Sequence, residues 1–307
     1  MMKLLKIAPL LVMFCAICLG GTAALAEENY AGTESCAACH EEQYKSYAGN
    51  LHAIKSDPRT PEVLHGCESC HGAGAAHVDA GGGKGVGGIK ALGKNSKLTT
   101  EEKAGICLQC HSKGMVALWA GSPHEGRGLD CMTCHSAHSG NPRNLAKATQ
   151  IEVCAQCHKN VKAQLQRQSH HPIREGKMAC TDCHNPHGTV AEKLIAANYL
   201  NEKCWECHTE KRGPFLWEHA PVTESCVTCH APHGSSHSKL LVAKRPYLCQ
   251  RCHSNSRHPG TLYAQSTAQE GQSVYSTMNS RLFYRSCENC HNTIHGSNHP
   301  SGKGLLR

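Results

Sequence analysis

A five-residue pattern of two cysteines and one histidine recurs ten times along this 307-residue chain. Each copy reads Cys-x-x-Cys-His, the attachment signal of c-type haem, in which two thiols bond the porphyrin and the adjacent imidazole binds the iron. The cysteines are Cys36, Cys39, Cys67, Cys70, Cys107, Cys110, Cys131, Cys134, Cys154, Cys157, Cys180, Cys183, Cys204, Cys207, Cys226, Cys229, Cys249, Cys252, Cys287 and Cys290. The predicted proximal iron ligands are His40, His71, His111, His135, His158, His184, His208, His230, His253 and His291.

Other uses of Cys-x-x-Cys do not require a histidine directly after it. Zinc sites, redox dithiols and disulfide frameworks share the cysteine spacing alone. With 24 histidines in 307 residues, a histidine at that place in all ten copies has a chance probability on the order of 10⁻¹¹. Twenty of the 22 cysteines lie in the motifs, so the sequence predicts ten covalently bound haems.

The motifs fall into five pairs, which predict five two-haem repeats in one domain over 27–307. The repeats span roughly 31–96, 97–143, 144–192, 193–238 and 239–307. One histidine precedes each second motif, and we call these the linker histidines: His52, His124, His171, His219 and His258. Another follows each second motif, and we call these the tail histidines: His77, His138, His187, His233 and His295.

These ten histidines are the predicted distal ligands, because their recurrence matches the number of irons. His65, His170, His237 and His299 are left over, and either His170 or its neighbour His171 could serve as a ligand. Methionine is the competing sixth ligand, but the methionines after the leader do not follow the repeat. Two imidazoles per iron predict low-potential haems with no open position, which suits electron transfer and not catalysis at an iron.

Composition predicts an unusual interior. Aromatic residues make up 5% of the chain, with only 3 phenylalanines, which is too little for an ordinary core of this size. The porphyrins would then supply much of the buried apolar area. We expect mostly irregular coil, short helices and almost no β-sheet, with Trp119, Trp205 and Trp217 packed on porphyrins.

Local signals predict a few elements. Thr99 and Thr100 before two glutamates indicate a helix start. Residues 149–168 and 191–211 are interpreted as helical segments that run through a motif. Pro and Gly predict turns over 183–188 and 229–234. The glycine-rich stretch 72–93 is interpreted as a flexible loop.

Residues 1–26 have the pattern of a secretory signal peptide. Lys3 and Lys6 precede an apolar run of about 14 residues, shorter than the roughly 20 that span a bilayer, and Ala24-Leu25-Ala26 forms an A-x-A cleavage site. Export agrees with haem attachment outside the cytoplasm. The formal charge of +8 does not predict nucleic-acid binding, since two propionates per haem would bring the loaded protein to roughly −4 when oxidised.

Three stretches resemble a known family. Residues 210–235 read EKRGPFLWEHAPVTESCVTCHAPHGS, residues 295–302 read HGSNHPSG and residues 180–188 read CTDCHNPHG. Together with ten motifs and a leader, they resemble the MtrA/DmsE/PioA family of decahaem cytochromes from about Thr33 onward. The resemblance supports His52, His77, His171 and His295 as ligands. The glycine-rich region near 72–94 and the extra His65 and His237 depart from the family pattern.

The resemblance implies a linear array of bis-histidine haems inside a porin-like outer-membrane β-barrel. Electrons would pass between the periplasm and the cell exterior in anaerobic or extracellular respiration. Expected partners are the barrel, an extracellular multihaem cytochrome or terminal reductase, and a periplasmic or inner-membrane quinol-linked cytochrome. The alternative is a soluble periplasmic electron shuttle to a terminal reductase.

Overall fold

The structure is a computed structural model that describes residues 29–93, 95–253, 287–300 and 302–306. The predicted leader over 1–26 and the linker histidine His258 lie outside these residues. Helices in the described part are short. Their bounds are α1 Thr33–Ala37, α2 Glu41–Ala48, α3 Pro61–Leu64, α4 Glu68–His71, α5 Ala75–Asp79, α6 Thr100–Leu108, α7 Cys131–Cys134, α8 Gln150–Cys154, α9 Lys159–Leu165, α10 Leu200–Trp205, α11 Ala220–Glu224 and α12 Tyr247–Gln250.

Capping boxes begin two of the helices that carry the first cysteine of a repeat, α6 and α8. The Thr99 hydroxyl accepts from the backbone N–H of Glu102, and the Glu102 carboxylate accepts from the N–H of Thr99 at 2.7 Å. Thr149 and Glu152 repeat this arrangement before α8. Each box satisfies two N–H groups that a helix start leaves without partners. The predicted helix start at Thr99 and Thr100 is confirmed.

The two predicted helical segments are wrong in extent. The segment 149–168 divides into α8 and α9, because Ala155 to His158 leave the helix where the motif turns toward its binding site. In the segment 191–211, Lys193 and Leu194 have φ angles of 54° and 58°, so no right-handed helix can pass through them. Only α10 and two single 3₁₀ turns form there.

Irregular chain connects the helices, as the composition predicts. The described residues contain no β-strand, only isolated bridges. Three of these bridges recur at one place in the repeat, and they join His135 to Leu145, His184 to Ile195 and His230 to Leu241. The predicted fold class of coil with short helices and almost no sheet is confirmed.

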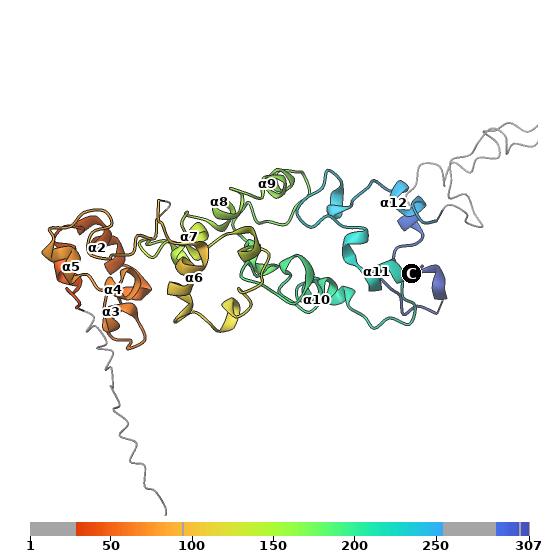
Figure 1. The fold of residues 1–307 in the computed structure, drawn as a ribbon. Coiled ribbons are helices and arrows are strands. Elements are labelled where there is room, and N and C mark those ends of the chain that lie inside the picture. Colours follow the sequence, from red (N-terminus) through yellow and green to blue (C-terminus); the bar gives the residue numbers. More distant parts are fainter. Residues whose placement is uncertain (1–28, 94, 254–286, 301, 307) are drawn as a thin grey trace, which may run out of the picture.

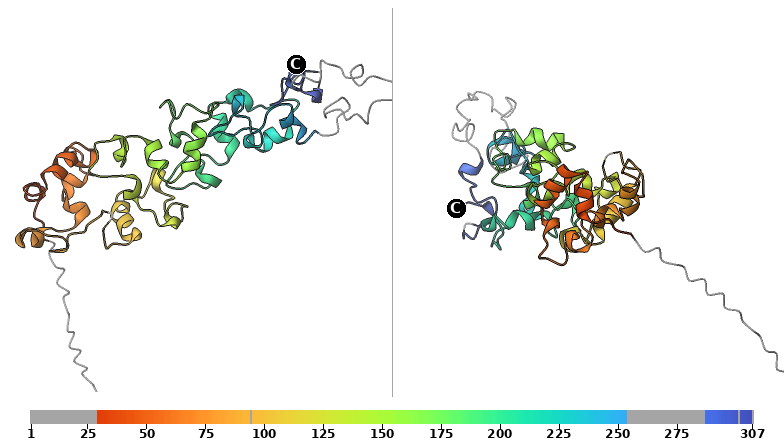
Figure 2. Two further views of the ribbon diagram at one scale, coloured as in Figure 1. Left: turned by 90° about the horizontal axis from the view of Figure 1, so that it is seen from above. Right: turned by 90° about the vertical axis from the view of Figure 1, so that its left-hand side faces the viewer.

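The described chain is elongated and runs in sequence order from one end to the other (Figure 1). Helices α2 to α5 lie at one end, α6 to α10 occupy the middle, and α11, α12 and the C-terminus lie at the opposite end. The view from above is equally long, whereas the end-on view is compact (Figure 2). The first and last repeats therefore lie far apart.

Few apolar side chains are buried along this length. Among the described residues they are Tyr47, Ala104, Trp119, Val153, Leu165, Ile195, Leu241 and Leu305. So small a set is well below the apolar core that an ordinary domain of this length requires. The fold therefore leaves most of its interior contacts to a bound group.

The glycine-rich stretch 72–93 is more ordered than the predicted flexible loop. It contains α5, and the Ala75 N–H donates to the Asn29 carbonyl at 3.2 Å. A Cβ on Gly87, which has a φ of 68°, would lie 2.3 Å from the backbone nitrogen of His77. The glycines thus allow the turn to close around His77.

None of the helices in the described ranges has the length and apolar character needed to cross a membrane.

Candidate haem-binding sites

Each motif forms a single helical turn. In all ten copies the backbone N–H of the motif histidine donates to the carbonyl of the first cysteine, at 2.9–3.1 Å. This i to i+4 bond brings residues one, four and five of the motif to one side of the turn. Two thiols and an imidazole on one side match what covalent haem attachment requires.

Neighbouring motifs contact each other in chain order. Within each repeat, the thiols of the two first cysteines lie close enough to shift each other's pKa: Cys36 with Cys67, Cys107 with Cys131, Cys154 with Cys180, Cys204 with Cys226 and Cys249 with Cys287. Between repeats, the second cysteines are close enough to interact electrostatically: Cys70 with Cys110, Cys134 with Cys157, Cys183 with Cys207 and Cys229 with Cys252. The ten motifs thus follow one another without a gap.

Eight motif imidazoles each face one predicted distal imidazole. Their ring centroids lie 6.0–6.4 Å apart in the pairs His71–His138, His111–His52, His135–His187, His158–His124, His184–His233, His208–His171, His230–His295 and His253–His219. An iron between two imidazoles needs about 2 Å to each nitrogen and roughly 1 Å more to each ring centre. The observed spacing therefore fits a six-coordinate haem iron.

The paired histidines come from different repeats. A linker histidine faces the first motif of the next repeat, as His124 faces His158. A tail histidine faces the second motif of the preceding repeat, as His233 faces His184. The facing imidazoles of these eight pairs therefore always come from two successive repeats, in both directions along the chain.

Backbone carbonyls hold one imidazole of most pairs. Second-motif imidazoles donate through Nδ1 to a carbonyl later in the chain, for example His184 to Lys193 at 3.0 Å and His230 to Lys239 at 2.8 Å. In the alternate pairs the linker imidazole is held, for example His171 by the Pro232 carbonyl at 2.8 Å. An occupied Nδ1 leaves Nε2 as the free base, which is the arrangement of metal-binding histidines.

Burial favours the neutral form of six of the predicted distal imidazoles. It is the largest cause that lowers the pKa of His52, His138, His187, His219, His233 and His295 below the ordinary value of histidine. A neutral imidazole has the lone pair that iron binds. The six side chains are therefore in the form that a ligand requires.

The alternatives His170 and His171 differ in their contacts. His170 bonds the Arg167 carbonyl through Nδ1 at 2.7 Å and the Glu175 carboxylate through Nε2 at 3.0 Å. The bond to Glu175 raises the pKa of His170, which favours the protonated form that cannot bind a metal. His171 has a free Nε2 and faces His208 at 6.4 Å, so the geometry favours His171.

The structure does not bring His77 against a motif imidazole. Its Nδ1 bonds the Val86 carbonyl at 3.0 Å, which leaves Nε2 free in the same way as in the paired histidines. His40, the first motif histidine, is exposed and faces no second imidazole among the described residues. The spare His65 stacks on Tyr30, with ring centroids 3.9 Å apart.

Sequence reasoning missed three supporting features. Glu68 is buried and accepts three backbone N–H bonds. Asn201, which is 2% exposed, donates to the carbonyls of Val222 and Thr223 and accepts from the N–H of Cys226 at 2.8 Å. Left-handed residues such as Lys193 present the carbonyls that hold second-motif imidazoles. Of the three features, only the left-handed residues could have been indicated by the sequence, because they recur at a similar distance after the second motifs of the three middle repeats.

Glycines after the tail histidines allow close contact between repeats. A Cβ on Gly234, whose φ is 149°, would lie 2.0 Å from the Gln164 carbonyl oxygen. Gly188 stands in the same relation to the Leu118 carbonyl, also at 2.0 Å. These contacts bring the tail histidine against the preceding repeat.

Replacing Gly234 by alanine should destabilise the protein by about 2–4 kcal/mol, because backbone must move and an unfavourable φ is added. Thermal unfolding of the haem-loaded protein measures the effect. Gly105→Ala is the matched control: it lies inside α6 with open space around it, and should stabilise by about 0.5–1 kcal/mol. Equal unfolding temperatures for Gly234→Ala and the unchanged protein would contradict the close contact.

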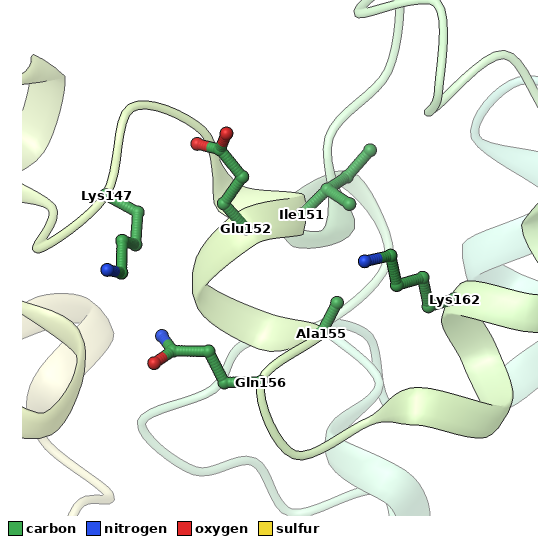
Figure 3. Close-up of a pocket in the computed structure, with 6 residues that line it drawn as sticks. All are labelled: Lys147, Ile151, Glu152, Ala155, Gln156 and Lys162. Carbon is green, nitrogen blue, oxygen red and sulfur yellow. The ribbon is translucent and has the colours of Figure 1, made fainter.

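Two surface hollows lie beside first motifs, and neither is lined by a cysteine or a histidine. The larger, of about 400 Å³, is lined by Lys147, Ile151, Glu152, Ala155, Gln156 and Lys162 (Figure 3). The lysine side chains lie on opposite sides of it. A second hollow, of about 320 Å³, is bounded by Glu102 of α6 and by Gln109, which has the same place in its motif as Gln156. The repeated position makes both of them features of the repeat, separate from the ligand pairs.

The coil with short helices, the recurring attachment turns and the facing imidazoles define a multihaem c-type cytochrome. The family of the doubled CXXCH motif matches residues 124–163, 170–213 and 219–258. Each match joins the second motif of one repeat to the first motif of the next, which is the junction where ligands are exchanged.

The multiheme cytochrome MtrA of Shewanella baltica (strain OS185) is 41% identical over 288 residues, which cover 92% of this chain and 84% of that protein. The chain therefore belongs to the MtrA family of multihaem cytochromes. Electron transfer through several c-type haems, which the motifs predict, is the corresponding activity.

Proposed function

We propose that all ten motifs carry haem and that every iron is held by two imidazoles. The eight facing pairs supply the ligands of the second to ninth motifs. These pairs leave over one distal histidine in each terminal repeat, which would serve a motif of its own repeat: His77 for the motif of His40, and His258 for the motif of His291. The five two-haem repeats then form one continuous ligand network.

Two imidazoles would hold each haem iron and would leave no position for a substrate. The haems would then transfer electrons with little rearrangement and would not catalyse a reaction at iron. The porphyrin iron supplies the redox chemistry. The residues of the chain would position the imidazoles and hold their tautomers through backbone carbonyls.

The proposed function is an electron conduit that passes through an outer-membrane β-barrel, between the periplasm and the cell exterior. The observation that carries it is the unbroken contact of successive motifs along an elongated molecule (Figure 1). Electrons could enter at one end and leave at the other. Partners would be a porin-like barrel, an extracellular multihaem cytochrome or terminal reductase, and a quinol-linked cytochrome on the periplasmic side.

The experiment is purification of the tagged, haem-loaded protein from its natural host. We expect a β-barrel protein to co-purify in equal amount from detergent-solubilised outer membrane. That complex in liposomes should let external dithionite, which does not cross lipid, reduce an enclosed redox dye. Liposomes with the barrel alone are the control. Recovery only as a periplasmic monomer would contradict the conduit and support the shuttle.

A further inference from the structure

Two tryptophans, the buried Trp119 and the half-buried Trp217, have buried indole N–H groups without an acceptor among the described residues. Trp119 is 6% exposed, and the Nε1 atoms of Trp119 and Trp217 are buried with no hydrogen-bond partner in the described part of the chain. An indole nitrogen can only donate, and a buried donor almost always has a partner in a folded protein. The missing acceptors therefore belong to a group that binds beside these rings.

Trp119 lies beside the fourth motif's site. Its ring centroid is 6.5 Å from that of His187, the tail histidine that faces His135. The preceding residue, Leu118, packs its carbonyl against Gly188. The indole is therefore fixed next to the ligand pair and cannot turn to bulk solvent.

The backbone of Trp217 lies beside the loop that carries the tail histidine of the eighth motif's site, and its indole edge faces Gly302 farther along the same C-terminal segment. Trp217 exchanges two backbone bonds of 2.9 Å with Ser297, two residues after the tail histidine His295. His295 faces His230 with centroids 6.1 Å apart. Both tryptophans thus lie where a linker segment meets the loop that carries a tail histidine.

Haem has few groups that can accept a hydrogen bond. Its edge is apolar apart from two propionates, and both axial positions of the iron are directed at imidazoles. We propose that Trp119 and Trp217 each donate the indole N–H to a propionate of the haem in the fourth and eighth motif sites. The proposal rests on the ligand pairs His135–His187 and His230–His295 proposed above.

The equivalent places near other second motifs lack a free N–H. Tyr47 lies five residues before its linker histidine, as Trp119 does, but its hydroxyl donates to the His52 carbonyl at 3.0 Å. Leu165 follows Gln164, whose carbonyl contacts Gly234, as Trp119 follows Leu118, whose carbonyl contacts Gly188. The Leu165 side chain is 4% exposed and has no N–H to donate. An unpartnered indole N–H is therefore present beside the fourth and eighth sites, and no such donor is found at the equivalent places beside the second and sixth.

A donated N–H stabilises the ionised propionate over the protonated form and so lowers its pKa. These two haems would take up a proton on reduction less readily than their neighbours. The bond would also fix the propionate in one orientation. Both effects concern the haem edge and leave the iron ligands unchanged.

Trp119→Phe tests the proposal in the fully loaded protein. It keeps an aromatic ring and removes the N–H, so we expect the acid dissociation constant of one propionate to fall roughly tenfold. The reduction potential of one haem should then depend more steeply on pH near neutrality. Resonance Raman spectra should show a shift of a propionate bending mode. Leu165→Phe is the matched control and should change neither.

A second measurement does not depend on a variant. In the reduced protein with ¹⁵N-labelled tryptophan, the Trp119 and Trp217 indole protons should exchange with deuterium far more slowly than that of Trp205. Fast exchange, or an unchanged pH dependence in Trp119→Phe, would overturn the proposal. A low-spin spectrum retained in Trp119→Phe would show that the ligand pairs stand independently of this bond.

Discussion

Replacing His233 by alanine is expected to convert the sixth haem, and not the eighth, to a high-spin or water-ligated form. His233 lies only three residues after the eighth motif, yet its imidazole faces His184 of the sixth motif at 6.0 Å. Removing it would open one axial position of that iron. Roughly one tenth of the haem should become high-spin in absorption and EPR spectra, with all haems still attached.

Variants that lack one haem show which site is affected. With Cys180 and Cys183 both replaced by alanine, the sixth haem cannot attach, and the added His233→Ala change should produce no further high-spin signal. With Cys226 and Cys229 replaced instead, the signal should persist. The opposite result would mean that ligands stay within their own repeat.

His237→Ala is the matched control for this change. His237 lies in the same loop, where its backbone N–H donates to the Ser235 hydroxyl at 2.9 Å. No motif imidazole faces it in the described residues. Its loss should leave every haem low-spin. A high-spin signal of equal size in His237→Ala would remove His233 from the ligand set.

The attachment turns could be predicted from the sequence because they are local. Five consecutive residues contain the two thiols and the imidazole, and one helical turn brings them together. The set of linker and tail histidines could also be proposed, since recurrence at fixed places needs no tertiary information. Two adjacent candidates, His170 and His171, could not be separated, because the choice depends on the bond to Glu175.

The pairing of imidazoles between repeats could not be predicted in this way. It joins residues such as His71 and His138 that are far apart in the chain, and spacing alone favours partners within one repeat. The error over 191–211 has a different cause. Lys193 and Leu194 favour helices by propensity, but the bond from His184 to the Lys193 carbonyl requires left-handed backbone there. Tertiary contacts around the sites therefore override the local preference.

Replacing Glu68 by alanine should selectively destabilise the first repeat. Glu68 is 4% exposed, and its carboxylate accepts from the N–H groups of Ala31 at 2.8 Å, Gly32 at 2.9 Å and Gly74 at 2.7 Å. Ala31 and Gly32 lead into the first motif, and Gly74 leads into α5 with His77. One side chain of the second motif thus joins the segments that position both haem sites of this repeat.

Alanine would leave three backbone donors without this acceptor, at about 1–3 kcal/mol for each one that stays buried. We expect a loss of about 3–5 kcal/mol, confined to residues near the N-terminal end because the later repeats do not use these bonds. Hydrogen exchange resolved by segment measures it: amides of 31–79 should exchange much faster, while those of 150–240 stay unchanged.

Glu68→Gln should give a smaller loss of about 1–2 kcal/mol. The amide keeps one oxygen as an acceptor, but its NH₂ group would face a backbone N–H, which is also a donor. Glu34→Ala is the matched control, because this acidic residue of the same repeat is exposed. It should leave the exchange of 31–79 unaltered. Uniformly faster exchange along the whole chain in Glu68→Ala would mean that the repeats unfold as one unit. In that case the pairing of His71 with His138 would couple the unfolding of the first repeat to that of the second. The hydrogen bonds of Glu68 would then not act on the first repeat alone.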